Sequence, residues 1–150
     1  MEITLQEMKN LIGKEISLGG WLEVTQKMIN QFAECTGAND WIHVDIARSD
    51  KGPYGRPIAQ GLLTLSLLPK LQSEIRLSIK GAKMEINYGL NKVRFISPVP
   101  VGSKIRVRSI LKNLEEKEAG TVLLTINRVI EIEGIEKPAC VAETLSLSYI

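Results

Sequence analysis

The segment from Gly61 to Leu71 constrains the fold more than any other feature, because it is apolar on nearly every side when drawn as a helix. A helix of this kind is normally buried by the rest of the protein. A membrane span is a poor alternative, since about 20 apolar residues are needed to cross a bilayer and Thr64, Ser66 and Lys70 interrupt this stretch. The rest of the chain of 150 residues is therefore expected to wrap around this helix.

Strand patterns dominate the second half of the chain. Alternation of apolar and polar side chains is clearest in residues 104–110 and 144–149, and it is typical of strands with one face buried. Helices in the first half and strands in the second indicate an α+β domain. We expect a single domain over residues 1–150, a hot-dog fold in which a curved antiparallel sheet wraps a central apolar helix. The predicted strands are Ala82–Tyr88, Asn91–Ile96, Lys104–Asn113, Thr121–Glu133 and Ala139–Tyr149.

The first half is predicted to be mainly helical. Thr25 is a suitable N-cap for a helix, and Gly37 is a suitable residue to end it. The predicted elements are a helix over residues 3–11 ended by Gly13, a strand over 14–24, a helix over 26–36, and a loop over 38–59 with a helical turn near 44–48.

Composition argues against several kinds of partner and site. The formal net charge is only +2, so nucleic acid is not an expected partner. The N-terminus lacks the features of a signal peptide and no membrane span is expected, so the expected location is the cytoplasm. Cys35 and Cys140 lie in apolar stretches and are expected to be reduced and buried. With a single histidine and no metal-ligand spacing, no metal site is expected.

His43 is the only histidine, and it lies in the predicted loop between Asp40 and Asp45. An imidazole can act as a general acid or base near neutral pH, and either aspartate could orient it or hold a water. The alternative is a structural role, in which the ring donates a hydrogen bond to a neighbouring carbonyl. Asp45 is more easily explained as the cap of the turn that follows it.

Gly61 stands where the apolar helix is predicted to begin. Free N–H groups at a helix N-terminus attract negative charge, which would suit a thioester oxygen that becomes an enolate. Close packing of the helix against the sheet is the alternative reason for a glycine there. Residues 88–95 are predicted to contain a glycine turn, from which Asn91 and Arg94 would face a pocket; a solvated strand edge is the alternative.

Three segments, in this order, resemble the MaoC-like dehydratases, and in particular the subgroup close to nodulation protein N. They are residues 32–45 (FAECTGANDWIHVD), 57–68 (PIAQGLLTLSLL) and 87–95 (NYGLNKVRF), and residues 98–102 (PVPVG) fit as well. The resemblance covers nearly the whole chain. It implies a hot-dog fold, usually a homodimer, and reversible (R)-specific addition of water to a trans-2-enoyl thioester of coenzyme A, with no cofactor besides that substrate.

In the chemistry that this resemblance implies, an Asp and a His five residues apart hold one water, and a backbone N–H at the start of the central helix stabilises the oxyanion. His43 matches the family histidine and Gly61 the oxyanion glycine. The chain departs from the pattern at Ala38, which occupies the position of the aspartate, and at Gln60, which replaces a residue that is usually His. Loss of one member of an acid–base pair commonly lowers the rate by about 10²–10⁴-fold.

Three explanations stay open. Asp40 can replace the missing base from a shifted loop; His43 can act alone, with Asn39 or Asp40 positioning water; or the domain has lost hydration and kept thioester binding. The leading hypothesis is an enoyl-CoA hydratase, and the alternative is a non-catalytic acyl-thioester binding protein, with a homodimer or larger homo-oligomer expected for either. A thioesterase would need a carboxylate near the helix, and the segment 61–71 has none. The resemblance further implies substrate contacts from Ala38, Asn39, Trp41, Tyr54, Gln60, Leu62, Asn91 and Arg94.

Overall fold

The computed structural model describes residues 1–72 and 76–150, and its main feature is a six-stranded sheet. The strand order is β2-β6-β7-β8-β5, with β3 also paired to β6, and every pairing in this sheet is antiparallel. The strands are β2 (Glu15–Leu18), β3 (Leu22–Glu23), β5 (Met84–Phe95), β6 (Lys104–Lys117), β7 (Thr121–Ile132) and β8 (Ile135–Tyr149). Gly102 and Gly134 adopt positive φ between or beside these strands, as turn glycines can without strain.

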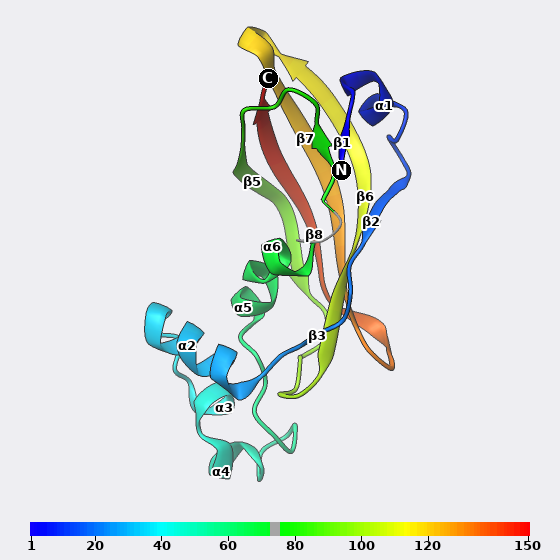
Figure 1. Cartoon of the computed structure of the whole chain (residues 1–150). Coiled ribbons are helices and arrows are strands. Elements are labelled where there is room, and N and C mark those ends of the chain that lie inside the picture. The colour runs from blue at the N-terminus through cyan, green and yellow to red at the C-terminus, as the bar shows by residue number, and fades with distance from the viewer. Residues whose placement is uncertain (73–75) are drawn as a thin grey trace.

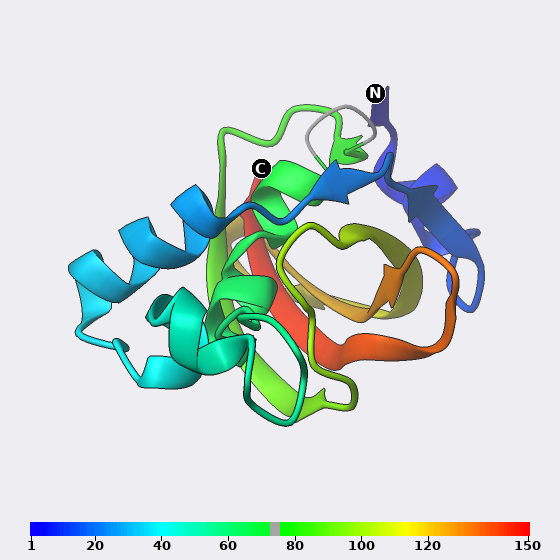
Figure 2. The same ribbon diagram turned by 90° about the horizontal axis from the view of Figure 1, so that it is seen from below.

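The expected wrapping of a helix by a curved sheet is confirmed. In Figure 1 the central helical segment lies against the middle of the sheet, and Figure 2 shows the sheet curling around it. This segment is α5 (Gly61–Ser66) followed by α6 (Leu68–Leu71), and Leu67 between them keeps helical backbone angles. Leu63, Leu68 and Leu71 are buried in the larger of two hydrophobic clusters.

The helix α2 (Gln26–Thr36) follows β3 and confirms both predicted boundaries. The Thr25 hydroxyl accepts a hydrogen bond from the N–H of Met28, and Gly37 ends the helix with a left-handed φ of 77°. Two short helices then follow, α3 (Trp41–Val44) and α4 (Ile46–Ser49). Figure 1 shows α2, α3 and α4 grouped at one end of the molecule.

The N-terminal segment covers the opposite end of the sheet (Figure 1). Thr4 and Glu7 form a capping box at the start of α1 (Leu5–Lys9). The short strands β1 (Glu2–Ile3) and β4 (Ser78–Ile79) pair in parallel. Met8 of α1 is buried in the second hydrophobic cluster, together with side chains of β4, β6 and β7.

Four sequence expectations are wrong. The strand expected over residues 14–24 is interrupted, since β2 ends at Leu18 and β3 begins at Leu22. Gly89 makes no turn: β5 runs straight through it, since β-bulges on either side absorb the extra residues without ending the pairing with β8. The helix from Gly61 is not buried on every side in the single chain, where the sheet covers one side and Leu62 is 60% exposed. Cys35 is exposed, because it lies two residues beyond Ala33 and so turns away from the buried side of α2. Cys140 is buried, as expected.

Within the described ranges, no helix is both long enough and apolar enough to cross a membrane.

Candidate active site

His43 is held in one orientation by the segment that leads into α5. Its ring Nδ1 lies 2.7 Å from the carbonyl oxygen of Ile58. Because a carbonyl oxygen can only accept, Nδ1 carries the proton and donates it, which leaves Nε2 with the lone pair when the ring is neutral. The backbone N–H of Ile58 donates to the carbonyl of Ile42 at 3.0 Å, so α3 and this segment are tied together twice. The ring is half-buried, and the arrangement suits a group that exchanges a proton at Nε2.

The side chain of Gln60 ties α2 and the loop before α3 to the start of α5. It is only 4% exposed, and its Nε2 donates to the carbonyl of Ile29 at 3.2 Å and to that of Ala38 at 3.1 Å. Its Oε1 is buried and has no hydrogen-bond partner among the described residues. Ala38 and Gln60 are therefore brought together, with Gln60 holding the backbone of the loop.

Gly61 opens α5, where the first N–H groups have no acceptor inside the helix. A Cβ added to this glycine would lie 3.0–3.1 Å from ring atoms of Phe95, tighter than ordinary contact. The packing alternative for Gly61 is thus supported by a specific neighbour, the ring of a residue near the end of β5. A free N–H and a close ring are compatible, and Gly61 lies three residues after Ile58, whose carbonyl holds His43.

The two aspartates beside His43 have different surroundings. The side chain of Asp45 accepts a hydrogen bond from the N–H of Arg48 at 3.0 Å and caps α4, as the sequence indicated. Asp40 precedes α3 and is exposed, with no side-chain capping bond. Over the described ranges, no hydrogen bond or ion pair joins the Asp40 carboxylate to His43. Asn39 is exposed as well.

Several predicted substrate contacts lie at the surface of the single chain. Leu62 is 60% and Tyr54 49% exposed. Trp41 is half-buried, and the guanidinium of Arg48 stacks on its ring at 4.2 Å from the centroid. None of these three side chains contacts His43 through a hydrogen bond in the described part of the structure.

Asn91 and Arg94 lie on β5, and no hydrogen bond joins either of them to His43 among the described residues. The Asn91 amide donates to Glu143 at 2.7 Å on the outer face of the sheet, where Lys112 also contacts this carboxylate at 2.5 Å. These two donors, Lys112 first, lower the pKa of Glu143. Arg94 is exposed and donates to the carbonyl of Val93. The hydrogen bonds of these two side chains are thus with neighbouring parts of the sheet, and their expected contact with substrate stays a prediction.

A cavity of about 830 Å³ lies between the sheet and the C-terminal part of the central helix. Leu65 and Ser66, one turn beyond Gly61, line its near side, but neither His43 nor Gly61 does. Arg128 lines it from β7. The sequence reasoning missed this residue, although a signal was present: in the alternation of residues 122–132, Arg128 occupies a position on the inward-facing side.

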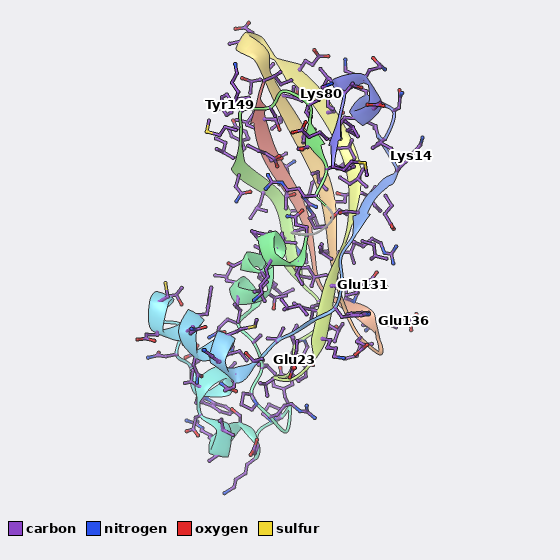
Figure 3. The ribbon with its side chains drawn as sticks, viewed as in Figure 1. Lys14, Glu23, Lys80, Glu131, Glu136 and Tyr149 are labelled. Atoms are coloured by element: carbon purple, nitrogen blue, oxygen red, sulfur yellow. The ribbon has the colours of Figure 1, made fainter. Side chains whose placement is uncertain are left out.

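The outer face of the same sheet carries paired charges. Glu131, labelled in Figure 3, accepts from Nε of Arg106 at 2.6 Å and from Nε of Arg108 at 2.8 Å. Partial burial raises the pKa of Glu131, and the hydrogen bonds from Arg108 and Arg106 lower it by more, so the carboxylate stays ionised. In the ranges that the structure describes, no group of three or more His, Cys, Asp or Glu side chains is placed to hold a metal ion.

Comparison with known proteins identifies relatives of the whole chain. Residues 7–132 match the family described as "MaoC like domain". The chain is 49% identical to "3-hydroxyacyl-thioester dehydratase Z" of Mycobacterium tuberculosis over 89% of this chain and 87% of that protein. It is 36% identical to "Nodulation protein N" of Rhizobium meliloti, over 98% of this chain and 92% of that one.

A solved structure shows the same fold at lower sequence identity. The (R)-hydratase from A. caviae involved in PHA biosynthesis superposes with a TM-score of 0.72 at 21% identity, covering 90% of this chain and 94% of that chain. The curved antiparallel sheet around a central helix is therefore the hot-dog fold.

Proposed function

The chain belongs to the MaoC-like domain family, and on that premise we propose that it adds water reversibly to trans-2-enoyl thioesters of coenzyme A, with (R) specificity. The observation that carries this proposal is the hydrogen bond from His43 Nδ1 to the Ile58 carbonyl. It fixes the ring and directs all of its acid–base chemistry to Nε2. The relative named as a dehydratase of 3-hydroxyacyl thioesters supports the same class of reaction, since hydration and dehydration are one equilibrium.

His43 and the start of α5 would share the work of the reaction. When water adds to the β-carbon of an enoyl thioester, negative charge develops on the thioester oxygen. The N–H of Gly61 faces that oxygen in our proposal, and a donor of this kind commonly contributes about 10²–10³-fold to a rate. In the hydration direction, Nε2 of His43, when protonated, gives a proton to the α-carbon while a second group takes one from the attacking water. In dehydration both transfers run in reverse.

The site has no second proton-transfer group at the position where the family resemblance places one. Ala38 stands at the position that the resemblance gives to an aspartate, and its methyl group transfers no proton. Asp40 is the nearest carboxylate along the chain on that side of His43, and we propose that it supplies the base when substrate orders the loop. Its exposure and freedom from other bonds leave its carboxylate available.

A second function is acyl-thioester binding without catalysis. The observation that favours it is the position of the Asp40 carboxylate. The Asp40 carboxylate makes no hydrogen bond or ion pair with the His43 ring in the described part of the chain, while Gln60 holds the backbone of Ala38 in place. A site in this state would bind a thioester and turn it over slowly or not at all.

The test is hydration of crotonyl-CoA, followed by loss of the enoyl absorbance, with binding measured in parallel by calorimetry. His43→Gln and Asp40→Asn are each expected to lower turnover by about 10²–10⁴-fold while binding persists. Asp50→Asn, at the end of α4, is the matched control and leaves turnover unchanged. Binding without turnover in the unsubstituted protein would establish the second function instead. Absence of both would refute the proposal.

We also propose that two copies pair through β5. This strand is at the edge of the sheet, and a long unpaired edge is a ready surface for another strand. Its exposed apolar side chains include Ile86 and Tyr88, which is 61% exposed. Light scattering should give a dimer for the unsubstituted chain and a monomer for Ile86→Lys/Tyr88→Lys. Ile135→Lys, at an exposed apolar residue in a different hairpin, should stay dimeric.

A further inference from the structure

Arg128 places a guanidinium on the inner face of the sheet, where apolar side chains are the rule. It lies between Ile126 and Ile130 on the inward side of β7, and is only 9% exposed. Its Nη1 donates to Ser109 Oγ at 2.6 Å and its Nε to Thr144 Oγ1 at 3.4 Å. Both partners are hydroxyls, which accept hydrogen bonds but carry no charge. Among the described residues, no carboxylate lies within ion-pair distance of this guanidinium.

Among the described residues, the charges near Arg128 leave it without an ion-pair partner. Glu85 lines the same cavity, but Arg76 forms an ion pair with it at 3.0 Å. Burial lowers the pKa of Arg128 to about 10, and Glu85 and Arg76 act in opposite directions on it. The guanidinium therefore stays protonated at neutral pH. One positive charge remains unmatched among the described residues that line the cavity.

The space beside Arg128 exists because its neighbours are small. Ala142 pairs with Arg128 in the sheet, and Thr144 and Ser146 follow on the same face of β8. Ser146 is 8% exposed and its hydroxyl has no partner among the described residues. Asn87 of β5 lies opposite Ser146 and lines the cavity too. A buried cation, a free hydroxyl and an amide thus converge on one cavity of about 830 Å³.

A stripe along the central helix connects the candidate active site with this cavity. Gly61, Leu65, Leu68 and Gln72 are spaced as one face of a helix, and the last three line the cavity. With a rise of about 1.5 Å per residue, Leu65 lies roughly 6 Å and Gln72 roughly 17 Å beyond Gly61 along the axis. An acyl chain whose thioester lies at Gly61 would reach Arg128 by following this stripe.

We propose that the cavity holds the far end of the acyl group, and that this end carries a carboxylate bound by Arg128. The inference rests on the proposed thioester site and specifies its substrate class: acyl thioesters of dicarboxylic acids. The guanidinium is a planar fork that matches a carboxylate with two parallel hydrogen bonds. With a plain alkyl chain bound, Arg128 would stay buried without a counter-charge from the described residues.

The test compares acyl-CoA pairs of equal chain length that end in a carboxylate or a methyl group. Glutaryl-, adipyl-, suberyl- and sebacyl-CoA and their methyl-ended counterparts are titrated into the full chain by calorimetry. At the best length, the carboxylate form should bind about tenfold to hundredfold tighter, as expected for a charged hydrogen-bonded pair. Arg128→Met should remove this preference, and Arg128→Lys should keep part of it.

Control variants and ligands distinguish a failure of the dicarboxylate inference from a failure of the proposed thioester site. Arg106→Met removes a guanidinium from the outer face and should leave the preference intact; thermal unfolding checks that each variant is folded. If the methyl-ended thioesters bind equally well or better, the inference is wrong and the proposed thioester site stands. If no thioester binds, both are wrong. If free adipate binds as tightly as adipyl-CoA, the cavity is an independent anion site and its assignment as an acyl compartment is overturned.

Discussion

A hydratase with a plain acyl pocket would need a carboxylate beside the histidine and only apolar side chains around the acyl chain. The two ends of the central helix each depart from this expectation, one by lacking a charge and the other by having one. At the N-terminal end, His43 and Gly61 are in place, but Ala38 supplies no carboxylate. At the C-terminal end, a pocket for an alkyl chain would need only apolar side chains, yet Arg128 brings a buried charge. Under the proposed function, one end lacks the carboxylate that hydration needs, and the other contains a charged group that packing alone does not explain.

The two ends of the central helix also differ in how their polar and charged groups are paired. The N-terminal end is held by specific contacts, since Gln60 Nε2 donates to two carbonyls and the Phe95 ring covers Gly61, although the buried Oε1 of Gln60 has no partner among the described residues. The C-terminal end is poorly satisfied, since Arg128 has hydroxyl partners only and Ser146 has none among the described residues. Departures from good pairing are expected at functional or strained sites. This is the reason for our proposal that Arg128 binds a ligand group.

The largest expected effect is at Ala38. Ala38→Asp places a carboxylate five residues before His43 and separates the two proposed functions. If the site binds thioesters without catalysis, hydration of crotonyl-CoA should rise by about 10²–10⁴-fold, because a second proton-transfer group is restored. If Asp40 already supplies the base, the gain should be small. The initial rate of absorbance loss measures it. Ala38→Asn has nearly the same shape without the base and should give no gain. An equal gain with Asn would show that shape or polarity matters there, and would contradict the assignment of Ala38 to the aspartate position.

The second prediction concerns the free energy of unfolding and the buried Arg128 near the C-terminal end of the central helix. Arg128→Met replaces an uncompensated buried charge by an apolar side chain of similar length, and should raise the free energy of unfolding by about 1–3 kcal/mol. Urea denaturation of the ligand-free protein measures it. Arg106→Met, at a paired guanidinium on the outer face, should lower stability by about 1 kcal/mol or less. If Arg128→Met is the more destabilising of the two, the bonds to Ser109 and Thr144 hold the sheet together and the comparison of the two ends fails.

The architecture was predictable from the sequence because it follows from periodicity and local capping. The apolar segment from Gly61 and the alternation in residues 104–110 required a sheet around a helix, and Thr25 and Gly37 set the bounds of α2. The break predicted at Gly89 failed for a physical reason. A glycine inside a strand also accompanies bulges, and only the pairing with β8 decides between a bulge and a turn.

The candidate site was predictable only in part. His43 and Gly61 are recognisable from their residue types and surroundings, whereas the bond from His43 to Ile58 joins residues far apart in the sequence. Arg128 could have been found from its inward position between Ile126 and Ile130. What no periodicity shows is that Ala142, Thr144 and Ser146 leave space beside it, because that depends on the register between β7 and β8.

The smallest expected effect tests whether packing explains the glycine at the N-terminal end. Gly61→Ala keeps the N–H group but brings a methyl to 3.0–3.1 Å from the Phe95 ring. Because this ring is 47% exposed, it can shift, and the free energy of unfolding should fall by only about 1 kcal/mol, at the low end for overpacking. In a Phe95→Ala background the loss should vanish. Gly89→Ala is the matched control, since its added methyl meets Leu145 at an ordinary 3.9 Å. If Gly61→Ala is neutral in stability but hydration slows, the ligand needs the space at Gly61 and Phe95 is not the reason for the glycine.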